Sequence, residues 1–380
     1  MNPTQDFVPG LQGVVAAQTR LSSVDGLAGE LIIAGYLLEE LASQATFEET
    51  VYLLWHDTLP NAAQLTEFTQ ALAAYRAIPQ VTVDLLRTAA AQKLDVMDAL
   101  RIAASTISLR AADEPAHEQR DALALVARFP AIIAAYWRLL NQQEPVSPRS
   151  DLSHAANYLY MLTGEAPTDE RTRGLETYLN TVMDHGLNAS TFTARVIIST
   201  GSDLISAVVG AVGALKGPLH GGAPGPALDM VFEIGTEANA EPHLWQMVKS
   251  GERLMGFGHR VYKVRDPRAE VLAQAAERMY LADGDMKLYN LAKHVEQTAV
   301  RVLEEFKPGR NLQTNVEFYT ALLLHGLDLP TDLFSPTFAI SRTAGWIAHC
   351  FEQQAVGRII RPESIYTGEK NRQWLPLESR

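Results

Sequence analysis

The stretch Leu204-Ile205-Ser206-Ala207-Val208-Val209-Gly210-Ala211-Val212-Gly213-Ala214-Leu215 carries no charged side chain, and it ends a nearly uncharged region that begins at Asn188. Its residues favour a helix, and a helix that is apolar on every side must be buried. The small residues allow close helix packing, either within the core or against a second copy of the chain, and the sequence leaves both open. The stretch therefore predicts a fold that is built around buried helices.

Helical patterns also recur along most of the remaining chain, over residues 46–55, 83–109, 121–140 and 151–162. Two helix starts have the spacing of a capping box, Thr46 with Glu49 and Asn61 with Gln64. Region 11–36 differs, because it has short β-prone runs and a turn signal at Asp25-Gly26. The sequence thus predicts an all-α fold with a small N-terminal β-hairpin.

The character of the chain changes after Gly217-Pro218. Shorter helices, more charge and glycine-rich breaks follow as far as Asn315, and a strongly apolar helix resumes at Thr337. This pattern indicates a smaller domain inserted into a larger, discontinuous one. We predict a large helical domain and a small helical domain, formed by residues 1–221 with 325–380 and by residues 222–324.

Composition excludes several classes of protein. The 380 residues are 47% hydrophobic and 20% charged, which is typical of a globular protein. A net charge of −12 argues against a general nucleic-acid surface. Cys350 is the only cysteine, so no intrachain disulfide can form and a reducing compartment is expected. With no visible signal peptide, and the apolar stretch 204–215 too short to span a bilayer, we expect a cytoplasmic protein without a membrane partner.

Two short segments each place a histidine between glycines. They are Leu215-Lys216-Gly217-Pro218-Leu219-His220-Gly221-Gly222 and Met255-Gly256-Phe257-Gly258-His259-Arg260-Val261-Tyr262-Lys263. A glycine lacks Cβ, so backbone and ligand can approach the ring closely. Imidazole also has the side-chain pKa nearest neutrality, which suits proton transfer or the stabilisation of an oxyanion. His220 and His259 are therefore candidate catalytic residues.

Three arginines share an apolar or proline-flanked setting: Arg268, Arg342 and Arg361. Arg342 lies in a strongly apolar helical segment, where an unpaired guanidinium would be costly. Each arginine alone could make a structural salt bridge, and each could also bind a substrate carboxylate through two hydrogen bonds. Together with the two histidines, they indicate a site for a small dicarboxylate.

His185, in Asp184-His185-Gly186-Leu187-Asn188, is a third candidate, although it could also belong to a polar cluster at a helix start. Three histidines with an open fourth position could bind zinc. No His-x-x-x-His pair is present, however, and nearby arginines would repel a cation. We predict no metal site. Glu317, in a largely apolar run, is either paired or has a raised pKa, and the latter suits a general base.

These motifs resemble those of the citrate synthases, in the short form of bacteria and archaea. The resemblance runs nearly end to end, through segments 10–14, 35–36, 184–190, 215–222, 255–268, 315–319, 342–349 and 358–362. It implies an almost entirely α-helical homodimer, with the active site in the cleft between two domains that close on substrate. It also implies condensation of acetyl-CoA with oxaloacetate and hydrolysis of citryl-CoA to citrate and CoA, with no cofactor.

The resemblance also implies roles for individual residues. His220 would donate a hydrogen bond to the thioester oxygen, and His259 would polarise the ketone of oxaloacetate. The oxaloacetate carboxylates would be held by His185, Arg268, Arg342 and, from the other subunit, Arg361. The expected CoA contacts are Gly256, Val261 and Tyr262 for the adenine and Lys263 and Arg310 for the phosphates.

One residue departs from the family pattern. The usual base is the aspartate of Asn-Val-Asp, and here Glu317 takes its place. Its side chain is longer by one methylene, and a misplacement of about 1 Å can cost about 10²-fold in rate. We expect the local backbone to compensate, although slower catalysis or another acyl-CoA would also follow from the change. The alternatives are therefore a 2-methylcitrate synthase that uses propionyl-CoA, or an inactive dimeric scaffold.

Overall fold

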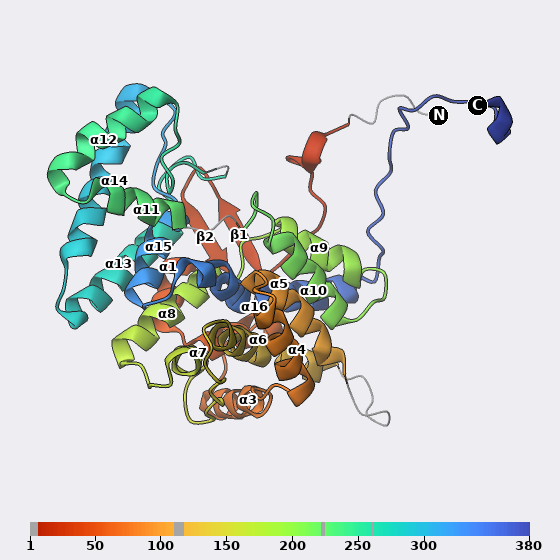
Figure 1. The fold of residues 1–380 in the computed structure, drawn as a ribbon, viewed down its shortest axis with the longest axis horizontal. Helices are drawn as coiled ribbons and strands as arrows, with labels where there is room; N and C mark the ends of the chain where they lie inside the picture. The colour runs from red at the N-terminus through yellow and green to blue at the C-terminus, as the bar shows by residue number, and fades with distance from the viewer. Residues whose placement is uncertain (1–6, 110–117, 222–224, 260) are drawn as a thin grey trace.

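The computed structural model describes residues 7–109, 118–221, 225–259 and 261–380. Within these ranges it contains sixteen α-helices and one small sheet, so the predicted all-α fold with an N-terminal hairpin is confirmed (Figure 1). The helices are α1 (Leu38–Gln44), α2 (Phe47–His56), α3 (Ala62–Ala74), α4 (Gln80–Ala91), α5 (Val96–Ala104), α6 (Glu118–Leu140), α7 (His154–Thr163), α8 (Asp169–Val182), α9 (Ala189–Ile198), α10 (Leu204–Leu215), α11 (Gly225–Ile234), α12 (Glu237–Ser250), α13 (Pro267–Asp283), α14 (Lys287–Phe306), α15 (Val316–Gly326) and α16 (Phe334–Val356).

The sheet has three antiparallel strands in the order β1-β2-β3, one more than the predicted hairpin. β1 (Ser22–Asp25) pairs with β2 (Glu30–Ile33), and β2 pairs with β3 (Tyr36–Leu37). The predicted Asp25-Gly26 turn signal lies where β1 ends and the loop to β2 begins, and the Asp25 carboxylate accepts hydrogen bonds from two backbone N–H groups of that loop. This side-chain contact fixes the turn.

Both predicted capping boxes form. Thr46 Oγ1 accepts a hydrogen bond from the N–H of Glu49, whose carboxylate accepts one from the N–H of Thr46, and Asn61 and Gln64 do the same at the start of α3. Two predicted long helical regions were wrong in extent. Residues 83–109 form α4 and α5, which are separated at Lys93, where φ is +52°, and region 188–215 forms α9 and α10. Local turns ended these helices where apolar periodicity did not.

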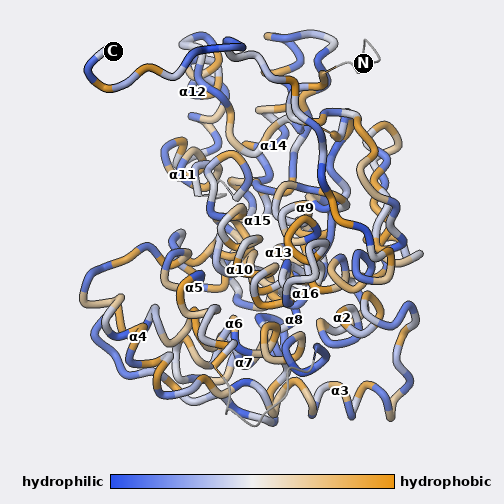
Figure 2. Tube along the Cα trace, turned by 90° about the vertical axis from the view of Figure 1, so that its right-hand side faces the viewer, coloured by the Kyte–Doolittle hydropathy of each residue, from blue (hydrophilic) through white to orange (hydrophobic). Residues whose placement is uncertain are grey.

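The core lies around α6 and α16, two helices of 23 residues that pack against each other. By length and composition α6 could cross a membrane, but 72% of its most apolar window is buried inside the protein, as in the core helix of a globular fold. α9 and α10 pack against each other and against α16. Figure 2 shows that α3, at the edge of the molecule, alternates between hydrophobic and hydrophilic residues.

Helices α11 to α15 gather on one side of the molecule (Figure 1). Within this group α12 packs on α14 and α13 packs on α15, and α13 also contacts α8 and α1 of the remaining chain. The division into two domains, with residues 222–324 as the smaller one, stays a prediction. The start of the predicted small domain, residues 222–224, lies outside the described residues.

The C-terminal segment leaves the helical body after Gly357 (Figure 1). Nearly all of its residues are exposed, including Ile359, Ile365 and Trp374, whose exposed fractions are 61%, 66% and 78%. Ser199 at the end of α9 accepts a hydrogen bond from the N–H of Ile360, at 3.0 Å, and so fixes the start of this segment.

Candidate active site

One cavity of about 780 Å³ brings together six of the residues that the sequence singled out. They come from five separate parts of the chain: the α8–α9 loop, the turn after α10, the loop before α13 with the start of that helix, helix α15 and helix α16. The six are His185, His220, His259, Arg268, Glu317 and Arg342. The predicted convergence of these side chains is therefore present within a single chain.

His220 lies in a turn that folds back on the end of α10. A Cβ added to Gly221 would lie 2.1 Å from the carbonyl oxygen of Leu215, so only glycine allows this approach. The His220 Nε2 lies 3.3 Å from the backbone N–H of Ser190 and 2.7 Å from its hydroxyl. Because an N–H can only donate, Nε2 is the accepting nitrogen. The proton of the neutral ring therefore sits on Nδ1.

His259 has the opposite arrangement. Its Nδ1 accepts hydrogen bonds from the backbone N–H groups of Val261 and Tyr262, each at 3.1 Å. The proton of the neutral ring is therefore on Nε2. This nitrogen lies 3.4 Å from a terminal nitrogen of Arg268, a distance at which two donors make no strong bond. The two histidines thus present opposite ring nitrogens as donors.

Burial keeps both of these histidines neutral. It lowers the pKa of His220 to about 4, with the charge of Arg342 acting in the same direction. It also lowers the pKa of His259 to about 4, with Arg268 adding to the effect and Asp266 opposing it. The pKa of His185 is likewise far below its usual value because of burial and of Arg268 and Arg342. At neutral pH all three rings are hydrogen-bond donors without charge.

His185 and His259 lie with their ring centroids 6.1 Å apart, and Tyr262 packs against both. The Tyr262 hydroxyl lies 3.1 Å from His185 Nε2. With an exposed fraction of 2%, the Tyr262 side chain lies beneath the two histidines rather than on the surface. Its side chain therefore supports the imidazoles and does not line the cavity.

The two arginines of the cavity are paired differently. Arg268 is 5% exposed and donates from Nε and from a terminal nitrogen to the two carboxylate oxygens of Asp266, at 3.0 and 2.7 Å. Arg342 is 2% exposed, and among the described residues its one hydrogen bond runs from Nε to the carbonyl of Val182, at 2.9 Å. Burial lowers the pKa of Arg342 to about 10, which leaves it charged at neutral pH. Arg342 is therefore a buried cation whose terminal nitrogens lack an acceptor in the part of the chain that the structure describes.

Glu317 stands in the first turn of α15. Asn315 caps this helix, since its Oδ1 accepts the N–H of Glu317 at 3.0 Å while its side-chain amide donates to the carbonyl of Gly258 at 2.8 Å. Burial raises the pKa of Glu317, and the positive charge of Arg268 opposes the shift. The predicted raised pKa is thus present. The cap also joins the segment that carries Glu317 to the loop that carries His259.

The remaining predicted residues do not enter the cavity as side chains, with the exception of Val261 at its rim. Gly256 is buried against Phe318. Lys263 and Arg310 are exposed on two loops that lie side by side, because Asn311 donates to the carbonyl of Lys263. Arg361 is exposed on the C-terminal segment and does not line the cavity of its own chain.

Sequence reasoning gave no role to Ser190, Trp346 or Asp184, although it quoted the segments that contain them. Trp346 Nε1 donates to Ser190 Oγ at 3.1 Å, so Trp346 helps to hold the residue that orients His220. The N-terminal segment also lines the cavity, through Gly10 to Ala16, a contribution that no chemical feature of these residues announced. Among the described residues, no group of three His, Cys, Asp or Glu could hold a metal ion.

Comparison with known proteins identifies the family. The family model described as "Citrate synthase, C-terminal domain" matches residues 10–363. The citrate synthase of Haloferax volcanii is 41% identical, over 98% of this chain and 98% of its own length. The chain belongs to the citrate synthase family.

Other similar proteins include both citrate synthases and a 2-methylcitrate synthase. The crystal structure of citrate synthase from Pyrobaculum aerophilum superposes with a TM-score of 0.88 at 38% identity, and covers 97% of this chain and 94% of that one. The Thermoplasma acidophilum citrate synthase, solved with carboxymethyl coenzyme A and oxaloacetate, has a TM-score of 0.87 at 29% identity, and covers 99% and 100%. A 2-methylcitrate synthase of Shewanella oneidensis is 36% identical, over 98% of this chain and 97% of its own length.

Proposed function

We propose that this chain is a citrate synthase, which condenses acetyl-CoA with oxaloacetate and hydrolyses the resulting citryl-CoA to citrate and CoA. The observation that carries the proposal is the pair of neutral histidines, with protons on opposite ring nitrogens, in one cavity with Glu317 and two buried arginines. Forming this carbon–carbon bond requires a base at the acetyl methyl and hydrogen-bond donors at two carbonyl oxygens.

In the first step, Glu317 removes a proton from the acetyl methyl group while His220 donates from Nδ1 to the thioester oxygen. His220 stays neutral, so it stabilises the enolic intermediate without adding a full charge. The raised pKa of Glu317 makes its carboxylate a stronger base than an exposed glutamate. The pKa of buried Glu317 is therefore closer to that of the weakly acidic methyl group than the pKa of an exposed glutamate would be.

In the second step, the enolic carbon attacks the ketone of oxaloacetate. His259 donates from Nε2 to the ketone oxygen and protonates the alkoxide that forms. Arg268, Arg342 and His185 hold the substrate carboxylates. Arg342 suits this role because its terminal nitrogens have no acceptor among the described residues, and a carboxylate would supply one. Water then hydrolyses the thioester, and none of these steps requires a cofactor.

A thiol-release assay tests the proposal. Purified protein with acetyl-CoA and oxaloacetate should release CoA and form citrate, detected by mass spectrometry, and omitting oxaloacetate should stop the release. Glu317→Gln keeps the shape of the side chain but removes the base, so it should abolish turnover while oxaloacetate binding persists. Oxaloacetate-dependent CoA release that is unchanged in Glu317→Gln would refute the assignment of the base. No release from any acyl-CoA would support the scaffold alternative.

The acyl-CoA preference is the finer part of the proposal. One extra methyl group is worth only about 1–3 kcal/mol in an apolar pocket, so acetyl-CoA and propionyl-CoA are close competitors. We favour acetyl-CoA because the Haloferax volcanii relative, at 41% identity, is a citrate synthase, whereas the 2-methylcitrate synthase of Shewanella oneidensis is 36% identical. The ratio of kcat/KM for the two substrates decides this, and a ratio in favour of propionyl-CoA would make the protein a 2-methylcitrate synthase.

We further propose that the enzyme is a homodimer in which Arg361 completes the partner's site. The support is that Arg361 lies outside the cavity of its own chain, on an exposed segment with large apolar side chains. Arg361→Ala and Glu317→Gln should each be inactive alone. Their mixed dimers contain one intact site, so refolding the two together in equal amounts should restore about a quarter of the activity. No recovery in confirmed mixed dimers would refute the shared site.

A further inference from the structure

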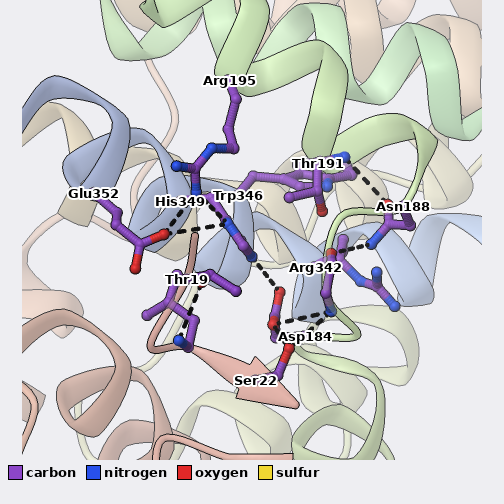
Figure 3. A network of polar contacts seen from close by, with 12 residues as sticks. Thr19, Ser22, Asp184, Asn188, Thr191, Arg195, Arg342, Trp346, His349 and Glu352 are labelled. Carbon is purple, nitrogen blue, oxygen red and sulfur yellow. Dashed lines mark hydrogen bonds and ion pairs between the residues drawn. The ribbon is translucent and has the colours of Figure 1, made fainter. Parts of the chain in front are cut away.

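A buried polar chain runs behind the cavity, from α9 through α16 to the loop between α8 and α9 (Figure 3). Its members are Arg195, His349 and Asp184, with exposed fractions of 1%, 0% and 0%. None of the three lines the cavity, and no step described above uses His349 or Arg195. The chain nevertheless ends at the residue next to His185.

Asp184 fixes the shape of the loop that carries His185. Its carboxylate accepts hydrogen bonds from Ser22 Oγ, from the N–H of Gly186 at 3.3 Å and from His349 Nε2 at 3.0 Å. The Ser22 hydroxyl also accepts the N–H of Gly186, at 2.8 Å. A fully buried carboxylate without donors is strongly unfavourable, so this loop conformation depends on the donors that satisfy Asp184.

The protonation of His349 follows from its two partners. A terminal nitrogen of Arg195 lies 2.9 Å from His349 Nδ1, and a guanidinium can only donate, so Nδ1 is the acceptor. The proton of the ring is then on Nε2, which donates to Asp184. The neutral imidazole therefore connects a buried cation to a buried anion, with a donor and an acceptor on the correct sides.

Arg195 is itself firmly held. The same terminal nitrogen donates to Glu352 at 2.6 Å, and Nε donates to the side chain of Gln353 at 3.2 Å. Glu352 also accepts the N–H of Arg20, just before β1. The far end of the polar chain is therefore anchored to α9, α16 and the N-terminal segment, and it can fix the near end in place.

The charge of Asp184 also acts on Arg342. Burial would raise the pKa of Asp184, but the electrostatic interaction and hydrogen bond with His349, the hydrogen bond from Ser22 and the charge of Arg342 hold it below its usual value. Asp184 in turn opposes the loss of the Arg342 proton that burial favours. An ionised Asp184 is therefore part of what keeps Arg342 charged and ready for a carboxylate.

We infer that His349 is a positioning residue for oxaloacetate. It links the anchored Arg195 to Asp184 by hydrogen bonds, and in this way it holds the loop that carries His185 in place beside Arg342. The inference rests on the proposed function, because it assigns oxaloacetate to His185 and Arg342. His349 acts through Asp184 and never touches the substrate. Its loss should weaken oxaloacetate binding more than acetyl-CoA binding.

Two amide variants separate positioning from mere packing. In His349→Gln the side-chain amide reaches the place of Nε2 and can still donate to Asp184, whereas in His349→Asn it reaches only the place of Nδ1. We expect His349→Asn to raise the KM for oxaloacetate at least about tenfold, equal to about 1.4 kcal/mol, with little change in the KM for acetyl-CoA. His349→Gln should recover most of the loss. The oxaloacetate-induced rise in Tm should follow the same order.

His154 provides a matched control, since it is also buried but begins α7, where it stacks on Phe47 of α2 at 4.3 Å. Its Nε2 has no hydrogen-bond partner among the described residues. His154→Gln should lower Tm without raising the KM for oxaloacetate. If His349→Asn and His349→Gln bind oxaloacetate equally, or if both substrates' KM values rise together, the inference is wrong. Absence of oxaloacetate-dependent CoA release in the unmodified protein would instead refute the proposed function.

Discussion

Replacing Glu317 by Asp restores the residue that the family pattern has at this position, and we expect it to impair this enzyme. The substitution shortens the side chain by one methylene, so the carboxylate withdraws by about 1.5 Å. Whether activity survives depends on how far the backbone of residues 315–317 can advance to make up that distance.

The structure leaves the backbone little freedom to advance. The N–H of Asn315 donates to the carbonyl of Gly256 at 2.9 Å, and the Asn315 side chain donates to Gly258 and accepts from Glu317. A Cβ added to Gly256 would lie 2.9 Å from Phe318 Cβ, so the first turn of α15 is already tight against this loop. Because a misplacement of about 1 Å can cost about 10²-fold, kcat should fall by roughly that factor.

Steady-state CoA release with saturating oxaloacetate measures the effect. We expect Glu317→Asp to lower kcat while the KM for oxaloacetate changes little, because the carboxylate-binding arginines are untouched. A primary isotope effect with methyl-deuterated acetyl-CoA should increase, since proton removal becomes slower relative to the other steps. If Glu317→Asp equals or exceeds the unmodified enzyme, the backbone is not fitted to glutamate and the reasoning fails.

Three further predictions follow from contacts around the cavity. Ser190→Ala removes one of two hydrogen bonds to His220, so kcat should fall about five- to tenfold. It also leaves the buried N–H of Trp346 without its acceptor, so the free energy of unfolding should fall by about 1–3 kcal/mol. A lower Tm with unchanged kcat would contradict the positioning of His220. Gly345→Ala places a Cβ 2.2 Å from the carbonyl oxygen of Met183, which should cost about 1–3 kcal/mol of stability and weaken oxaloacetate binding. Gly174→Ala, whose added Cβ would be in ordinary contact at 3.5 Å, should do neither. Equal effects of the two variants would contradict a role for the close contact between Gly345 and Met183. Glu317 acts as a base only when it is ionised, so kcat/KM should decline as the pH falls through its pKa, which burial places above the ordinary 4.5. His220 and His259 stay neutral down to about pH 4 and do not cause this decline. An acid midpoint at or below 4.5 in the pH profile would argue against Glu317 as the base.

The features that were predicted from the sequence depend on residues close together in the chain. Capping boxes at Thr46 and Asn61 depend on residues three positions apart, and glycines beside His220 and His259 mark close approach within one turn. These features are readable because both partners lie in the same short segment. The convergence of the histidines with Glu317 was predicted from the family resemblance, and the structure places them around one cavity.

The missed features depend on residues far apart in the chain. Ser190 and Trp346 are separated by 156 positions, and Asp184 and His349 by 165, so no spacing rule brings them together. Arg195 was visible only as a lone cation in an almost uncharged region. The predicted continuity of region 188–215 failed because Gly201, at φ +81°, turns the chain between α9 and α10. Such turns interrupt a helix without disturbing the apolar composition.

Helix α16 contacts four residues between the end of α8 and the start of α9. Arg342 donates to Val182, Gly345 packs on Met183, Trp346 donates to Ser190 and His349 donates to Asp184. A single inserted residue within this span would rotate everything beyond it by about 100° and break the later contacts together. Diverging descendants of this gene can therefore exchange side chains here far more readily than they can gain or lose a codon.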